Sequence, residues 1–209
     1  NSMRWTGEEL VHMLQTRAIQ FEPSSLIPGY YRLPTASIHQ LQPFLDRGQI
    51  TVQDESAGLI VELMAPEPGE RILDLCAAPG GKLIAAYVHM KGEGQFTAVE
   101  VSEERAERLR ENIERIGATN IEVIVQDARE FTAEPFDRVL ADVPCSAMGL
   151  LRKRPDVRWR RKSHHLAAQH KLQAEIINHA LELTMPGGVL VYSTCSILPS
   201  ENADIVNTF

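Results

Sequence analysis

From Glu70 onward, short apolar runs alternate with longer segments in which apolar residues recur every three or four positions. The short runs predict strands over residues 71–76, 95–100, 121–126, 136–142 and 189–195. The helical spacing predicts helices over residues 81–90, 102–116 and 165–184, and a last helix that begins at Glu201. Strands that alternate with helices are joined by right-handed crossovers, so the pattern predicts an α/β fold with a doubly wound, mostly parallel sheet.

Residues 1–50 have a different pattern. Thr6 is suited to cap a helix that runs to about Ala18, and residues 30–33 form one short strand candidate. Prolines interrupt the rest of this segment, and its apolar positions are too few for a hydrophobic core of its own. We therefore divide the chain into a partial N-terminal subdomain with a linker, residues 1–50, and a second domain, residues 51–209.

Composition places the chain among folded proteins with an acidic balance. It has 28 Asp and Glu against 21 Lys and Arg, a net charge of −7 over 209 residues, which argues against a general coat of basic charge for nucleic acid. No apolar run is long enough for a bilayer and no signal peptide opens the chain, so we expect a cytoplasmic protein with no membrane partner. The three cysteines make no metal-binding pair and the histidines around residue 165 lack a second ligand cluster, so we expect no metal.

The charge is distributed unevenly, however. Residues 152–162 hold seven basic side chains and one aspartate, a local charge of +6 that leaves −13 for the rest of the chain. Arginine and tryptophan together suit contacts to phosphates and stacking on bases, which predicts a local RNA-binding surface. The residues expected on it are Arg152, Lys153, Arg154, Arg158, Trp159, Arg160 and Arg161.

The segment after the first predicted strand suits a cofactor, because its small residues and two glycines let a ligand approach the backbone. The glycine pattern of dinucleotide sites is absent, and Cys76 and Leu83 stand where a phosphate-binding loop needs glycine and a hydroxyl residue. S-adenosylmethionine, which carries no phosphate, remains. The residues expected to hold it are Asp74, Cys76, Ala77, Ala78, Pro79, Gly80, Gly81, Lys82, Glu100, Asp127 and Asp142.

Acidic residues close four of the predicted strands. Glu100 is suited to the ribose hydroxyls and Asp127 to the adenine amine, while Asp74 and Lys82 suit the two ends of the methionine tail. A single acid in such a position is often a helix cap or a solvated loop residue. Four acids at the same edge of a sheet favour a ligand.

The fourth and fifth predicted strands lead into Cys145 and Cys195, which a doubly wound order brings to one crevice. A poor carbon nucleophile such as C5 of cytosine must be activated by addition of a thiolate at C6 before it can take a methyl group. An acid near N3, here Asp142, stabilises the charge that develops on the ring. Two thiols and one carboxylate therefore favour methylation of cytosine by covalent catalysis.

With these residues the chain resembles the RsmB/Sun (Fmu) family of bacterial 16S ribosomal RNA cytosine-5 methyltransferases, within the wider NOL1/NOP2/Sun group. The matching blocks are TVQD (51–54), DLCAAPGGK (74–82), DVPCS (142–146), RPDVRW (154–159) and VYSTCSILPSEN (191–202). They occur in family order over roughly residues 50–209. The resemblance implies a Rossmann-like class I S-adenosylmethionine-dependent methyltransferase fold.

The resemblance also implies roles for single residues. Cys195 would be the nucleophile, Cys145 would assist release of the methylated product, and Asp142 would contact the target cytosine. DNA cytosine-5 enzymes use the cysteine of the Pro-Cys block and lack a Thr-Cys partner, so the presence of both blocks favours RNA. Leu83 and Met148 depart from the usual family residues, which affects details of cofactor contact and base fit.

Members of this family carry a helical NusB-like RNA-binding domain upstream and a final strand pair that completes a seven-stranded sheet. Residues 1–50 resemble the tail of an RNA-recognition-like subdomain. We therefore expect a catalytic-core fragment, monomeric, that binds its cofactor and methylates 16S rRNA poorly. The alternatives are the same chemistry on tRNA or another rRNA cytosine, and a non-catalytic RNA-binding factor in ribosome assembly. A small-molecule methyltransferase would need neither the two thiols nor the basic segment.

Overall fold

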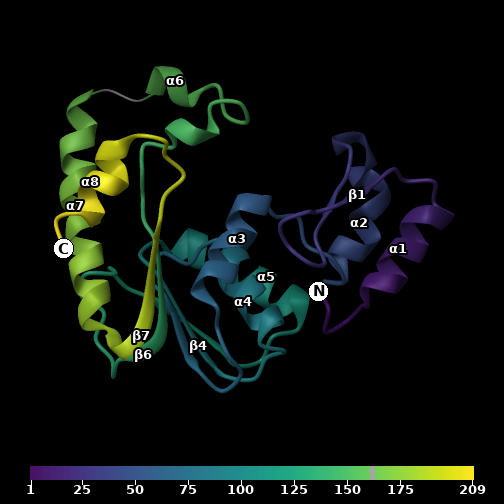
Figure 1. Cartoon of the computed structure of the whole chain (residues 1–209), viewed down its shortest axis with the longest axis horizontal. Coiled ribbons are helices and arrows are strands. Elements are labelled where there is room, and N and C mark those ends of the chain that lie inside the picture. Colours follow the sequence, from purple (N-terminus) through teal and green to yellow (C-terminus); the bar gives the residue numbers. More distant parts are fainter. Residues whose placement is uncertain (161–162) are drawn as a thin grey trace.

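The computed structural model describes residues 1–160 and 163–209 of the chain. A five-stranded sheet with the strand order β5-β4-β3-β6-β7 forms its centre (Figure 1). In that order the strands are Ile121–Val125, Gln95–Glu100, Arg71–Asp74, Phe136–Asp142 and Thr184–Ser193. Every neighbouring pair runs parallel, which confirms the predicted doubly wound α/β fold.

Helices cover both faces of the sheet. The buried side chains of α3 (Glu55–Met64), α4 (Gly81–His89) and α5 (Glu103–Ile116) pack with Ile72 on one face. The next residue, Leu73, points to the opposite face and packs with the buried side chains of α7 (Ser163–Glu182). Successive side chains of a strand alternate between faces, so the apolar run of β3 fills both halves of the core.

Local signals fix the ends of α5 where the sequence predicts them. The Ser102 hydroxyl accepts a hydrogen bond from the Arg105 backbone N–H, and Glu103 and Glu104 lie in the first turn, where the helix dipole favours anions. Gly117 ends the helix with a φ of +75°, in the left-handed region that favours glycine.

Other element bounds differ from the prediction. β7 begins at Thr184 instead of residue 189, because the chain after α7 enters the sheet directly and absorbs the Pro-Gly-Gly turn as a register irregularity opposite Phe136 and Arg138. Helix α3 is absent from the prediction, although Asp54 caps it and Glu55 lies in its first turn. The last predicted helix is split into η3 (Pro199–Glu201) and α8 (Ala203–Val206).

The first fifty residues form more regular structure than the sequence indicates. They comprise α1 (Gly7–Thr16), a two-stranded antiparallel pair of β1 (Glu22–Pro23) and β2 (Tyr31–Arg32), η1 (Thr35–Ser37) and α2 (Ile38–Asp46). Their side chains form a small hydrophobic cluster of Met13, Leu14, Ile19 and Leu41. The Arg115 guanidinium donates to the Leu45 carbonyl at 2.8 Å, which joins this segment to the end of α5.

Within the described part of the chain, no helix is long and apolar enough to cross a membrane.

Candidate functional site

The predicted site residues lie along the carboxyl-terminal edge of the sheet. Asp74, Glu100 and Asp142 are the last residues of β3, β4 and β6, and Asp127 follows two residues after β5. Ligands of open parallel sheets bind at this edge, where strand order changes direction. The topology therefore brings together four acids that are far apart in the sequence.

The loop between β3 and α4, residues 74–82, is anchored on α5. The Arg105 guanidinium donates to the Ala78 carbonyl at 2.7 Å, and the Asn112 amide donates to the Pro79 carbonyl at 3.0 Å. Gly80 has a φ of +100°, and a Cβ built on it would lie 2.5 Å from Cδ1 of Leu109. Glycine at this position is therefore required both by the backbone conformation and by the contact with α5.

Asp74 is buried and titrates unusually. Its Oδ1 accepts a hydrogen bond from the Cys76 backbone N–H at 3.2 Å, which turns the chain out of β3 at this residue instead of at residue 76 as predicted. Burial, together with the negative charge of Asp142, raises the pKa of Asp74 to about 7. A cation placed beside this carboxylate would stabilise its ionised form and lower its pKa again.

The Glu100 side chain is 1% exposed. Among the described residues, one of its carboxylate oxygens accepts a hydrogen bond and the other accepts none. Its Oε1 accepts from the Ser102 backbone N–H at 3.1 Å and lies 3.3 Å from the Arg105 guanidinium. Its Oε2 has no hydrogen-bond partner among the described residues. A buried carboxylate oxygen without a donor is costly, so this atom suits a hydroxyl group of a ligand.

Asp127 forms an ion pair that the sequence analysis missed. Arg129 donates to Asp127 Oδ1 at 3.0 Å and to Oδ2 at 2.7 Å, and it also contacts Glu175 of α7 at 2.7 Å. Hydrogen bonds from Arg129 lower the pKa of Asp127 to about 2. A carboxylate has about four acceptor positions, so Asp127 retains capacity for another donor.

Asp142 is held on both oxygens by residues from two other elements. The Lys82 ammonium of α4 lies 2.6 Å from its Oδ2, and the Ser193 hydroxyl at the end of β7 donates to its Oδ1 at 2.6 Å. Lys82, which the sequence assigned to the cofactor tail, therefore pairs with Asp142 in the structure. Ser193 lies in the matching block over residues 191–202, but the sequence does not predict its contact with Asp142, because that contact depends on the register of β6 with β7.

Cys145 and Cys195 lie beside each other, as predicted. Their sulfur atoms are 2.8 Å apart, and the Cys195 backbone N–H donates to the Cys145 sulfur at 3.2 Å. The hydrogen bond from the Cys195 thiol lowers the pKa of Cys145 to about 7, and the same contact raises the pKa of Cys195. The two thiols therefore titrate as one coupled pair that shares a proton across the contact.

The environment of the third thiol, Cys76, differs from that of the Cys145–Cys195 pair. It lies in the loop after β3, and burial, reinforced by the charge of Asp74, raises the pKa of its thiol. A thiol that stays protonated at neutral pH is not a nucleophile, so we assign no chemical step to Cys76.

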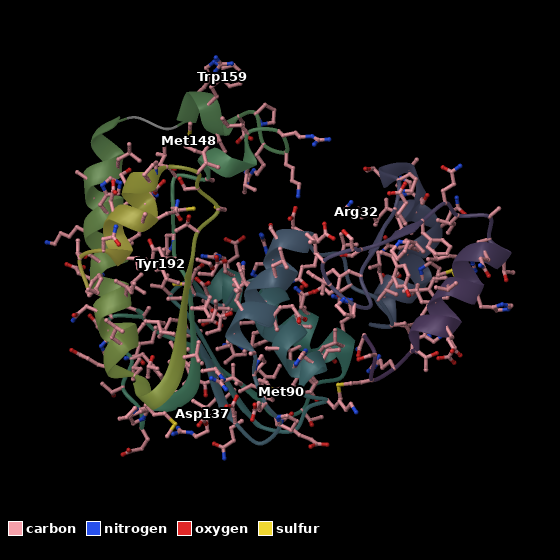
Figure 2. All side chains as sticks on the ribbon, in the orientation of Figure 1. Arg32, Met90, Asp137, Met148, Trp159 and Tyr192 are labelled. Atoms are coloured by element: carbon pink, nitrogen blue, oxygen red, sulfur yellow. The ribbon has the colours of Figure 1, made fainter. Side chains whose placement is uncertain are left out.

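The basic segment leaves the site through η2 (Met148–Leu150) and the short helix α6 (Val157–Arg160). Trp159 is 76% exposed and lies at the tip of this segment, away from the body of the molecule (Figure 2). Arg152, Lys153, Arg154 and Arg158 are also exposed, whereas only the backbone of Arg160 is described and Arg161 lies outside the described residues. The Lys153 ammonium forms an ion pair with Asp54, which caps α3 on the other side of the site.

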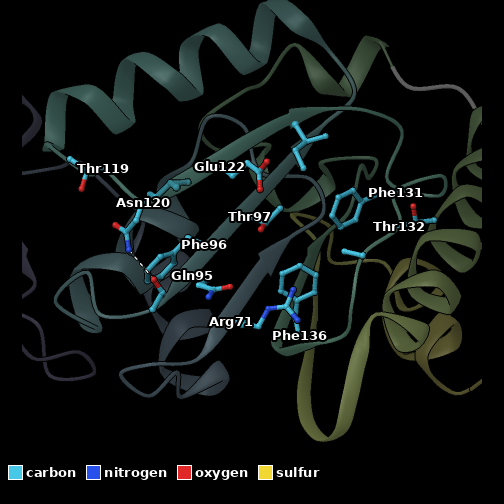
Figure 3. A pocket seen from close by; sticks show the side chains of 14 residues that line it. Arg71, Gln95, Phe96, Thr97, Thr119, Asn120, Glu122, Phe131, Thr132 and Phe136 are labelled. Carbon is cyan, nitrogen blue, oxygen red and sulfur yellow. Dashed lines mark hydrogen bonds between the residues drawn. The ribbon is translucent and has the colours of Figure 1, made fainter.

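A cavity of about 600 Å³ lies at the opposite edge of the sheet (Figure 3). Arg71, Gln95, Ile121 and Phe136, the first residues of four strands, contribute to its lining. None of the residues predicted for cofactor or chemistry lines it. The candidate site is therefore the carboxyl edge, where the acids and the thiols converge.

Comparison with known proteins identifies the family. The family model for 16S rRNA methyltransferase RsmB/F matches residues 61–209, which contain the four acids at the strand ends and the three cysteines. The chain belongs to this family.

Relatives agree in sequence and in fold. Ribosomal RNA small subunit methyltransferase B of Photorhabdus laumondii is 39% identical over the whole chain, which covers 49% of that protein. The chain thus spans about half the length of the curated relatives it matches. A methyltransferase homolog from Pyrococcus horikoshii superposes with a TM-score of 0.86 at 29% identity, covering 98% of this chain and 66% of the other. NSun6 from Pyrococcus horikoshii, solved with SFG, gives a TM-score of 0.76 at 31% identity, covering 85% of this chain and 45% of the other.

Proposed function

We propose that this chain is part of an S-adenosylmethionine-dependent RNA methyltransferase that methylates C5 of a cytosine in 16S rRNA. The observation that carries the proposal is the pair of thiols, Cys145 and Cys195, 2.8 Å apart at the sheet edge that also holds Asp142. Methyl transfer to an oxygen or nitrogen atom needs no thiol nucleophile, whereas C5 of cytosine requires one. Relatives named as small-subunit rRNA methyltransferases support the choice of substrate.

S-adenosylmethionine, when bound, supplies an electrophilic methyl group. We assign Glu100 to its ribose, because Oε2 of this buried carboxylate lacks a donor. We assign Asp74 to the ammonium of the methionine tail. A cation would stabilise the ionised form of this carboxylate, which burial and the charge of Asp142 disfavour. We also assign to the cofactor site the backbone of residues 76–82 and the Asp127 carboxylate, which can accept a further hydrogen bond.

The proposed covalent step begins at Cys195. Its sulfur forms a bond to C6 of the cytosine while its proton passes to Cys145, and the C5–C6 electron pair moves to C5. We assign the contact with N3 of the cytosine to Asp142, whose carboxylate is held by Lys82 and Ser193. After C5 has gained the methyl group, it loses its hydrogen as a proton to water. The S–C6 bond then breaks and Cys145 returns its proton to the departing sulfur.

The proposed RNA contact lies on the segment from Arg152 to Trp159, which follows the Cys145 loop. Its exposed arginines suit phosphates, and Trp159 suits stacking on an unpaired base. Because C5 and C6 are accessible only when the cytosine is unstacked, a single-stranded or loop substrate is favoured. We further propose that residues 51–209 form the methyltransferase domain and residues 1–50 a smaller subdomain packed beside α5.

The test uses RNA that contains 5-fluorocytosine, whose fluorine cannot leave as a proton. The protein is expected to form a covalent adduct with this RNA, and Cys195→Ala to form none. Cys145→Ala is expected to slow both formation and release of the adduct, because Cys145 accepts the Cys195 proton in the first step and returns it in the last. Ser25→Ala, at an exposed position outside the site, is the control and should retain the adduct with 5-fluorocytosine. Normal methylation by Cys195→Ala would refute the mechanism, and bisulfite mapping of 16S rRNA from cells lacking the gene would identify the target.

A further inference from the structure

Glu201 is a fully buried carboxylate that no part of the proposed mechanism uses. It is 0% exposed and lies in η3, six residues after Cys195. Buried acids are rare unless hydrogen bonds compensate for the lost hydration, so its surroundings need an explanation.

The carboxylate is bound by the loop that carries Cys145. The Ser146 backbone N–H donates to Glu201 Oε1 at 2.8 Å, and the Ser146 hydroxyl donates to Oε2. The Gln173 amide of α7 donates both to Oε1 at 3.1 Å and to the Pro144 carbonyl at 2.9 Å. The residues on either side of Cys145 are therefore fixed through Glu201.

The same network reaches the loop that carries Cys195. The hydroxyls of Ser146 and Ser196 lie 3.2 Å apart, and the Tyr192 hydroxyl donates to the Glu201 carbonyl at 2.8 Å. Ser196 directly follows Cys195, and Tyr192 belongs to β7. Through Ser146 and Ser196, the Glu201 carboxylate thus connects the two loops that carry the sulfur atoms.

We infer that Glu201 is a positioning residue for the thiol pair: its buried carboxylate holds the Cys145 loop against the Cys195 loop and places a negative charge nearer to Cys145. This inference rests on the proposed function, because it concerns how the two thiols divide their roles.

The charge of Glu201 supports the assignment. Burial alone would raise the pKa of Glu201, but hydrogen bonds from Ser146, Ser196 and Gln173 outweigh it and lower the pKa, so the group stays ionised. Its charge acts to raise the pKa of Cys145, against the larger effect of the Cys195 hydrogen bond that lowers it. A fixed anion on the Cys145 side favours movement of the shared negative charge toward Cys195, the proposed nucleophile.

The experiment measures alkylation of each cysteine by iodoacetamide across pH, with peptide mapping to separate Cys145 from Cys195. Glu201→Gln is expected to reduce the ratio of the Cys195 rate to the Cys145 rate by roughly tenfold, since one pKa unit corresponds to a tenfold change. Ser146→Ala keeps the charge and weakens the connection, so a smaller reduction is expected. Because Ser146→Ala changes volume little, it also serves if Glu201→Gln does not fold.

The matched control is Glu70→Gln, which removes the carboxylate partner of Arg138 at the other end of β6. It is expected to lower Tm and leave the alkylation ratio unchanged. An unchanged ratio in Glu201→Gln or, failing that variant, in Ser146→Ala would overturn the inference and leave Glu201 a purely structural residue. The measurement needs neither RNA nor cofactor, so it is separate from adduct formation with 5-fluorocytosine RNA, whose absence would instead refute the proposed function.

Discussion

The Lys82 ammonium and the Asp142 carboxylate lie 2.6 Å apart and connect the start of α4 to the end of β6. The Ser193 hydroxyl holds the other carboxylate oxygen, so three elements fix the orientation of one side chain. An acid that must meet a substrate ring in one geometry benefits from such restraint on both oxygens.

Ser193→Ala tests that restraint without changing any charge. A hydrogen bond to a charged group contributes about 1.5–3 kcal/mol, so we expect methylation to slow by roughly 10–100-fold. The Kd for S-adenosylmethionine, measured by calorimetry, should change less than twofold. Ser25→Ala, an exposed position, is the control. A large loss of cofactor affinity with an unchanged rate would contradict the role given to Asp142.

Asp74 predicts a pH-dependent stability. Its pKa is raised to about 7 in the folded protein, so between about pH 4 and pH 7 the folded state binds more protons than the unfolded state. Stability from this group therefore falls as pH rises through that range, and the loss is complete above about pH 7. We expect Asp74→Asn to raise the Tm of the cofactor-free protein by a few degrees above pH 7 and to change it little near pH 4.

The same substitution should weaken binding of S-adenosylmethionine, because the amide cannot neutralise an ammonium. Asp46→Asn, on the exposed side of α2, should show neither effect. A Tm difference for Asp74→Asn that is constant with pH would show that this carboxyl does not titrate near neutrality.

We expect Gly80→Ala to lower the stability of the fold for two separable reasons. The substitution strains a φ of +100° and places a methyl group 2.5 Å from Cδ1 of Leu109. Gly69 has a φ of +95° and open space around it, so Gly69→Ala isolates the backbone strain. We expect urea unfolding to give about 1 kcal/mol for Gly69→Ala and a further 1–3 kcal/mol or so for Gly80→Ala. Equal losses would mean that Leu109 moves aside freely.

We expect Asp54→Asn to increase the affinity of the protein for RNA. Asp54 pairs with Lys153, and this ion pair competes with phosphates for the Lys153 ammonium. Asparagine caps helices as well as aspartate does, so α3 should keep its N-terminus. Binding of a single-stranded RNA at low salt should tighten about two- to fivefold, with a smaller gain at high salt. Asp156→Asn, also in an ion pair but within the basic segment itself, separates this effect from a general loss of negative charge.

The sequence predicts the sheet well because its signals are local. The strand over residues 136–142 has the predicted bounds, and the helix after Ser102 ends at Gly117 as expected. The helix combines apolar residues at helical spacing with a cap and a stop, and the strand is a short apolar run. Helix α3 has Asp54 as its cap, but its apolar residues read equally as an irregular linker.

The candidate site is predicted in its acids and thiols, but not in their partners. The matching blocks contain all of these residues, but Ser193 meets Asp142, and Glu201 meets Ser146 beside Cys145, only after β6 and β7 have paired. Lys82 was assigned to a ligand, since the sequence does not show that Asp142 lies within its reach. Arg129 stands two residues from Asp127, so their ion pair is one that a sequence can indicate locally.

The parallel register of β6 and β7 pairs Asp142 with Ser193. Cys145 follows the first of these partners by three residues and Cys195 follows the second by two. The spacing between the two sulfur atoms is thus determined by two short loop lengths counted from one rung of the sheet. Deletion of Thr194, which belongs to neither core cluster of the sheet, would shift the Cys195 sulfur by about 3 Å along the chain direction. Within such a fold, the chemistry can be lost or altered by small changes in loop length while folding is preserved.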